Sequence, residues 1–201
     1  MGMILAPQFI GMKGAAVSTT WNSADKGSGV ALSNGDLTTA YAGVGDNDQG
    51  IRNTLSKTTG KFYIESTLHA TVELLHGFAT STPCVQCPGG SNHASSWVLR
   101  GDINMMFDGA NTSSVGTTPS NGDIMMMAVD IDAGKAWWGT NGTWYDGGDP
   151  GAGTGAHCTS VSGAIFVYQY NAGSRTETTT TNFGATAFSY TIPSGFTAWI
   201  D

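Results

Sequence analysis

Residues 122–145 read G-D-I-M-M-M-A-V-D-I-D-A-G-K-A-W-W-G-T-N-G-T-W-Y and predict two adjacent β-strands joined by a tight turn. We expect the first strand at 124–131, the turn at Asp132-Ala133-Gly134 and the second strand at 135–140. Asn141-Gly142 then ends the second strand, because this dipeptide tolerates the positive φ angles of a turn.

One face of this predicted hairpin is apolar. Successive side chains of a strand point to opposite faces, so alternate residues share a face. The side chains expected on the apolar face are those of Met125, Met127, Val129, Ile131, Ala136 and Trp138. A hairpin alone is marginally stable in water, so the rest of the chain is expected to supply a second sheet that covers this face.

The rest of the chain also favours β-structure. Few segments show a 3.6-residue apolar period, and the 201 residues are enough for one large β domain or two small ones. Further strands are expected at 29–32, 36–41, 51–55, 60–71, 76–81, 96–100, 104–107, 163–170, 176–183 and 196–200. Loops are expected at 43–50, 82–95, 108–121 and 145–160. Many short strands separated by turns predict an all-β antiparallel sandwich.

Charge and composition argue against several classes of protein. The formal net charge is -7, and the eight Lys and Arg residues are scattered, so we expect no nucleic-acid binding. No apolar run is long enough for a membrane span, and we expect no membrane insertion. The N-terminus carries no basic residue before its apolar part, so no secretory leader is expected. Three cysteines without a leader fit a reducing cytosol.

Residues 1–18 precede the expected strands and are interpreted as an N-terminal extended arm, followed by one domain at 19–201. The arm contains Ile4, Leu5, Phe9 and Ile10, which are costly to leave in water. We therefore expect the arm to dock on a neighbouring subunit during assembly. A frayed chain end is the alternative interpretation.

Several segments resemble, in the same order, those of the SPRY (B30.2-like) domain family. The strongest is G-D-I-M-M-M-A-V-D-I-D-A-G-K-A-W-W-G-T-N-G at 122–142, similar to the family hairpin G-D…D…G-x-x-x-F-x-x-N-G. Others are G-K-F-Y-I-E at 60–65, H-G-F-A-T-S at 76–81, G-A-I-F-V-Y at 163–168, T-T-T-N-F-G at 179–184 and I-P-S-G-F at 192–196. Residues 21–35 (W-N-S-A-D-K-G-S-G-V-A-L-S-N-G) resemble the opening of SPRY-like proteins encoded by bacteriophages.

The resemblance implies a SPRY/concanavalin-like jelly-roll sandwich whose loops at one end bind a partner, usually a protein. It implies no chemistry, because a fold hosts many functions. Trp137 and Trp138 depart from the pattern, since the family usually has smaller residues there.

The aromatic residues near the hairpin are the leading candidates for partner binding. Trp137 is expected to point away from the apolar face, and Trp144 and Tyr145 follow the hairpin. Trp and Tyr are frequent anchors for protein and sugar contacts. Alternatively, loops fold over these side chains and make a second small core. Three further loop residues are candidates for partner contacts: His93, Arg100 and Asn111.

A zinc site is a weaker hypothesis. Cys84-x-x-Cys87 and His93 lie close in the sequence, and His157-Cys158 follows far downstream. Zinc requires four such ligands in a tetrahedron, and a second short-spaced pair is missing. A local disulfide or unpaired thiols are the alternatives, and we expect no metal and no other cofactor.

No catalytic motif is present. The spacings G-x-S-x-G and H-E-x-x-H do not occur, and the carboxylates of Glu65, Glu73 and Glu177 are scattered and expected to be solvated. We therefore expect a protein without enzymatic activity.

These observations favour a bacteriophage virion structural protein, in head decoration or in a fibre or tail, assembled in the bacterial cytoplasm. Its expected partners are other virion proteins, further copies of itself, and a host surface receptor or glycan. Two alternatives stay open: a soluble peptide-binding adaptor module and a carbohydrate-binding receptor module.

Overall fold

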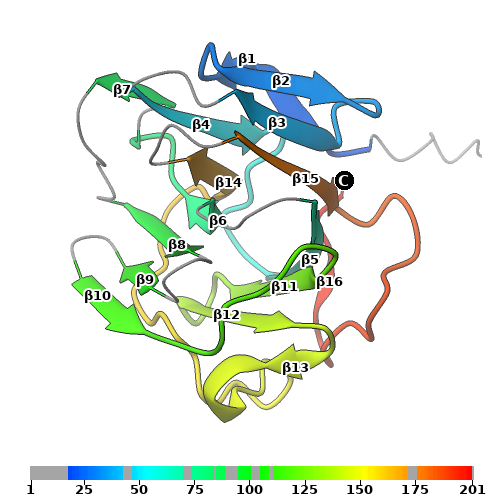
Figure 1. The fold of residues 1–201 in the computed structure, drawn as a ribbon. Coiled ribbons are helices and arrows are strands. Elements are labelled where there is room, and N and C mark those ends of the chain that lie inside the picture. The colour runs from blue at the N-terminus through cyan, green and yellow to red at the C-terminus, as the bar shows by residue number, and fades with distance from the viewer. Residues whose placement is uncertain are drawn as a thin grey trace, which may run out of the picture.

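The chain forms two β-sheets that pack face to face, as the computed structural model shows (Figure 1). The structure describes residues 18–42, 47–69, 74–83, 85–88, 95–100, 105–108, 111–171 and 176–200. Nearly all strand pairs are antiparallel, which confirms the predicted antiparallel sandwich. No helix in this described part of the chain is long and apolar enough to cross a membrane.

The first sheet begins at an N-terminal strand and ends at a hairpin. In spatial order it contains β1 (Trp21–Lys26), β4 (Asn47–Asn53), β14 (Phe166–Asn171), β6 (Leu75–Ala79), β8 (Ser96–Arg100), β9 (Met105–Asp108) and β10 (Asn111–Ser114), with β7 (Gln86–Pro88) beside β4.

The second sheet contains the hairpin at 122–145. Its spatial order is β13 (Thr143–Trp144), β12 (Lys135–Thr140), β11 (Ile124–Asp130), β5 (Lys61–Leu68), β15 (Thr176–Asn182), β3 (Thr38–Ala42) and β2 (Val30–Ser33), with β16 (Thr197–Ala198) parallel to β5.

The hairpin has the predicted faces. Met127 lies opposite Trp138, and Val129 lies opposite Ala136. All six side chains predicted for the apolar face are buried between the sheets. There Trp138 packs edge-on against Phe78 of β6, with ring centroids 5.9 Å apart, and its indole N–H donates to the His76 carbonyl at 3.0 Å. The hairpin therefore joins the two sheets through its inner face.

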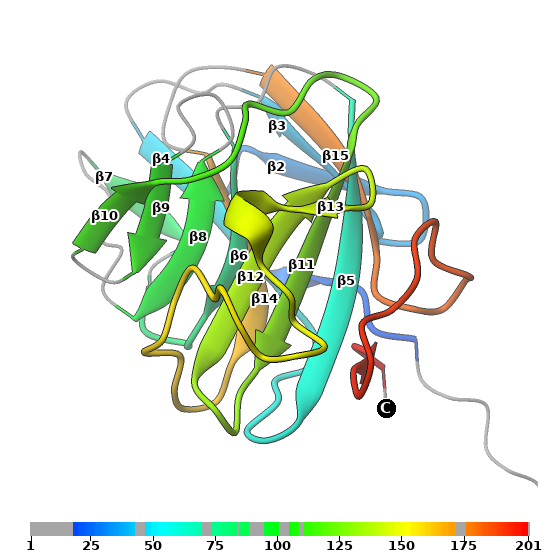
Figure 2. The same ribbon diagram turned by 90° about the horizontal axis from the view of Figure 1, so that it is seen from below.

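The outer face of the hairpin is covered by residues 184–196, which we call the C-terminal strap. It runs beside β5 (Figure 2) and is anchored there by Glu65. The Glu65 carboxylate accepts the backbone N–H groups of Ser189 and Tyr190, both at 2.8 Å, and the Tyr63 hydroxyl at 2.8 Å. Beneath the strap lies a second apolar cluster formed by Tyr63, Met126, Ala128, Trp137 and Phe196.

Some predicted loops contain strands. β10 and the last residue of β9 lie within the predicted loop 108–121, β7 lies within 82–95, and β4 begins within 43–50. The sequence of β10 is N-T-S-S, which has no apolar alternation. Pairing with β9 at the sheet edge, rather than a local pattern, makes this segment a strand.

Candidate functional site

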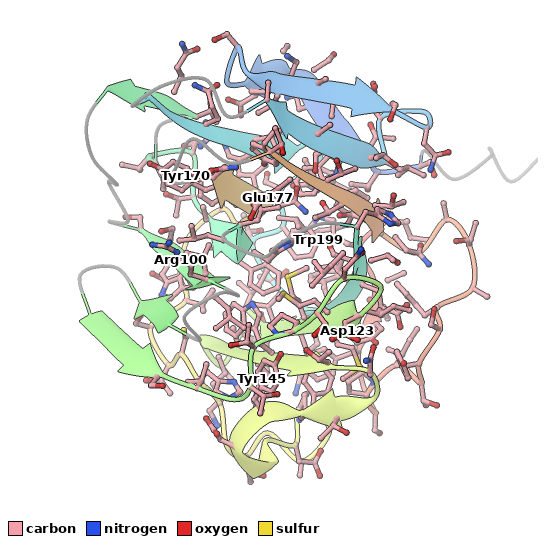
Figure 3. All side chains as sticks on the ribbon, viewed as in Figure 1. Arg100, Asp123, Tyr145, Tyr170, Glu177 and Trp199 are labelled. Carbon is pink, nitrogen blue, oxygen red and sulfur yellow. The ribbon has the colours of Figure 1, made fainter. Side chains whose placement is uncertain are left out.

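A groove of about 650 Å³ opens where β11 begins and β12 ends. It is lined by residues 116–117 and Asp123 from the segment before β11, by the end of β12, by β13, and by the 3-10 turn η2 (Tyr145–Gly147). Asp123 and Tyr145, labelled in Figure 3, both belong to this lining. The groove contains two of the predicted partner-binding residues, Trp144 and Tyr145.

Tyr145 forms a buried part of the groove wall. Its side chain is 6% exposed, and its hydroxyl is hydrogen-bonded to the Thr140 hydroxyl. Burial raises the pKa of the Tyr145 phenol, so it stays protonated. Gly116 lies against the ring with φ +63°, and a Cβ at this position would be 2.4 Å from the ring. Only glycine fits this contact with Tyr145.

One rim of the groove is fixed by Asn141. Its backbone has φ +50°, a conformation that Asn tolerates better than most residues. The side-chain oxygen accepts the Ile124 N–H at 2.9 Å, and the side-chain amide donates to Asp123 at 2.7 Å. The other Asp123 oxygen accepts the Ser120 N–H at 2.7 Å. These bonds hold the rim in place without a ligand.

The lining also contains Asp146. Its side chain is 56% exposed, and its backbone has φ +51° and ψ +27°, followed by Gly147 at φ +70°. One carboxylate oxygen accepts the Gly116 N–H at 3.4 Å. The other lies 3.7 Å from Nε2 of His157.

His157 lies beneath Asp146 with a side chain that is only 3% exposed. Its Nδ1 accepts the backbone N–H of Trp138 at 3.3 Å, which places the proton of the neutral ring on Nε2, facing Asp146. Burial lowers the pKa of His157, although the nearby Asp146 carboxylate acts in the opposite direction. At neutral pH the imidazole is therefore uncharged.

Trp144 and Tyr145, two of the predicted partner-binding residues, both line the groove. Trp144 is half-buried and packs edge-on against Tyr63, with ring centroids 6.2 Å apart. Because Trp144 keeps exposed surface in the lining, it can contact a ligand directly.

Trp137 is on the predicted outer face, but it is not a surface residue. Its side chain is 0% exposed, it packs edge-on against Phe196, and its indole N–H donates to the Thr154 carbonyl at 2.8 Å. For Trp137 the alternative interpretation, burial in a second small core, is therefore correct. The strap and the segment around Thr154 exclude partners from this side chain.

The other predicted loop residues do not meet at the groove. Arg100 is the last residue of β8, is half-buried, and pairs with Met105. Asn111 is the first residue of β10 and pairs with Asp108, so it is in an edge strand and not in a loop. His93 lies outside the described residues, as do Ile4, Leu5, Phe9 and Ile10 of the predicted arm.

The described residues contain no zinc site built from the predicted ligands. Cys84 and His93 lie outside the described residues, and Cys87 is the middle residue of β7. Cys158 is buried in the core between the sheets. Within the described ranges no three His, Cys, Asp or Glu side chains are grouped as metal ligands require.

The prediction of solvated carboxylates is wrong for Glu65 and Glu177, which are 3% and 2% exposed. Glu65 is buried because it anchors the strap, a contact between segments more than a hundred residues apart in the sequence. Glu73 lies outside the described residues.

The lining residues that were not among the predicted contacts include Asp123, Asn141 and Asp146. Asn141-Gly142 signals a turn, and Asp146-Gly147 is of the same type. These signals locate the turns, but they do not show that the turns border one groove.

Comparison with protein-family models and with curated proteins finds no match to this sequence. Solved structures do match. The chain is similar to the SPRY domain of human HERC1, with a TM-score of 0.62 and 11% identity, over 83% of this chain and 99% of that one. It is also similar to stonustoxin, with a TM-score of 0.61 and 12% identity, over 82% of this chain and 27% of the stonustoxin chain. The chain thus has a SPRY-like fold, as its sequence predicts.

Proposed function

We propose that this chain is a non-enzymatic protein-binding module that holds an extended peptide segment of its partner in the groove beside Trp144. The observation that carries the proposal is a half-buried tryptophan in a groove of about 650 Å³ whose rim is already hydrogen-bonded. A pre-formed hollow with an aromatic anchor and a few fixed polar groups is typical of binding sites.

The polar groups of the lining favour binding over catalysis. A hydroxyl nucleophile needs a base within hydrogen-bond reach. The hydroxyl of Thr140 is bonded to Tyr145, and His157 faces the Trp138 backbone and Asp146. The Thr140 hydroxyl and the His157 imidazole therefore both have structural contacts, which supports a binding role.

The proposal is tested with an mRNA-displayed library of random peptides selected on the whole chain. Peptides that bind the groove should lose affinity when Trp144→Ala is introduced. Phe188→Ala is the matched control, because Phe188 is another half-buried aromatic residue that packs on Tyr63 but lies outside the groove. A selection without binders, or binders indifferent to Trp144→Ala, contradicts the proposal.

The narrower form of this proposal is a bacteriophage virion structural protein whose partner is another particle protein or a host receptor. It is supported by the resemblance of residues 21–35 to the opening of phage SPRY-like proteins. Mass spectrometry of purified particles should detect the chain, and deletion of residues 1–17 should abolish its incorporation. Absence of the chain from particles would leave a free adaptor module.

A glycan array tests the carbohydrate-binding alternative. Binding of a glycan that is lost in Trp144→Ala, together with failure of the peptide selection, would replace the peptide proposal by that alternative.

A further inference from the structure

We propose that the segment held in the groove presents a Lys or Arg side chain to Asp146, with Trp144 beside it. This inference rests on the proposed peptide-binding function and names the chemistry that the groove recognises.

The charged side chains among the described lining residues are all acidic. They are the carboxylates of Asp123 and Asp146, and no Lys or Arg is among these residues. Both Asp123 oxygens already accept strong hydrogen bonds, from Asn141 and Ser120 at 2.7 Å each. Asp146 accepts one long bond of 3.4 Å from Gly116 and is more than half exposed. Asp146 is therefore the carboxylate with acceptor capacity directed at a ligand.

The nearest described group that could neutralise Asp146 does not do so at neutral pH. His157 is buried, its pKa is lowered, and its Nδ1 accepts a backbone N–H. Its Nε2 is buried and lies 3.7 Å from the Asp146 carboxylate. A neutral imidazole carries no positive charge to offset the negative charge of the Asp146 carboxylate.

The position of Asp146 is fixed before a ligand arrives. The turn holds its backbone in the left-handed region, which non-glycine residues adopt rarely, and Gly147 continues the turn at positive φ. Gly116 packs on the Tyr145 ring and directs its N–H to Asp146. A turn held in this way costs little backbone ordering entropy on binding.

A cationic side chain can interact with both the Asp146 carboxylate and the Trp144 indole. Lys and Arg donate charge-assisted hydrogen bonds to carboxylates and are attracted to the face of an indole ring. The net charge of -7 also favours encounter with a basic segment, in a salt-dependent manner.

The test is to sequence the peptides that the mRNA-displayed library yields after selection on this chain. Peptides whose binding depends on Trp144 should be enriched in Lys or Arg. Replacing that basic residue by Ala, or introducing Asp146→Asn, should weaken binding about tenfold or more, and the two changes together should cost little more than one. Asn tolerates the same backbone conformation, so the variant is expected to fold. The matched control is Asp132→Asn, which removes one exposed carboxylate at the other end of the hairpin and should leave affinity unchanged.

Charge reversal gives a second measurement. Asp146→Lys should select peptides with Asp or Glu in place of the basic residue. Peptides that depend on Trp144, lack basic residues and tolerate Asp146→Asn would overturn this inference and leave the proposed function standing. A library without groove binders would overturn both.

Discussion

Trp137 and Trp144 come from the same outer face of one hairpin and differ in exposure. Trp144 of β13 lies opposite Gly139 of β12, and Gly139 shares a face with Trp137 because they are two residues apart. Trp137 is 0% exposed, whereas Trp144 is half-buried and lines a groove. The pleat decides the face, and a distant segment decides whether that face is accessible.

The strap covers one part of this face. Phe196 packs edge-on against Trp137, and Glu65 fixes the strap through two backbone N–H groups. Beside Trp144 the turn η2 and the segment before β11 border a hollow instead of filling it. Changing each part in turn tests whether the covered region supplies stability and the open region supplies recognition.

The largest expected effect is that of Trp137→Ala. Removing a fully buried indole leaves a cavity under the strap and the Thr154 carbonyl without its donor, so we expect a loss of about 3–5 kcal/mol in the free energy of unfolding. Denaturant titration of the purified chain measures this loss. A loss below about 1 kcal/mol would mean that the strap does not pack on Trp137 in solution.

The next largest expected effect is the loss of stability in acid that the buried His76 causes. Complete burial lowers the pKa of His76 from 6.5 to about 3. Between these two pKa values the unfolded chain binds more protons than the folded one, so stability falls as the pH decreases below about 6.5. We expect His76 to lower the free energy of unfolding by about 3 kcal/mol between pH 7 and pH 4.5.

Denaturant titration across this pH range checks the contribution of His76. His76→Gln should flatten the pH dependence, whereas His69→Gln, at an exposed histidine, should leave it largely intact. If His76→Gln keeps the full acid sensitivity, other groups cause it.

The sequence predicts the inner face of the hairpin well, because the apolar alternation at 125, 127, 129 and 131 is a local signal that determines which side chains share a face. It predicts Trp144 and Tyr145 as candidates for the same kind of reason, since they follow a recognisable turn. The burial of Trp137 depends on Phe196 of the strap, more than fifty residues further along the chain. The burial of Glu65 depends on strap residues more than a hundred positions away. Contacts between such distant segments leave no periodic pattern in the sequence. The sequence therefore predicts neither the burial of Trp137 and Glu65 nor the border of the groove.

Glu65→Gln should loosen the strap without removing its apolar contacts. The Glu65 carboxylate is a charged acceptor of three hydrogen bonds, whereas the Gln amide is neutral and has one acceptor oxygen. We therefore expect a loss of about 2 kcal/mol in the free energy of unfolding. Hydrogen exchange should speed up at the amides of Ser189 and Tyr190, and the β11–β12 amides should stay protected. Uniform acceleration over both regions would show that strap and hairpin open as one unit.

Trp144→Ala should have the smallest effect on stability and the largest effect on recognition. The indole keeps exposed surface and makes a T-shaped ring contact with Tyr63, so we expect a loss of about 1 kcal/mol or less in the free energy of unfolding. Peptide affinity should nevertheless fall by about tenfold or more, because anchor side chains carry most of the binding energy. Parallel denaturant and binding titrations of Trp144→Ala and Trp137→Phe separate the two roles. If Trp144→Ala costs as much stability as a core substitution, the difference between the covered and open halves of this face disappears.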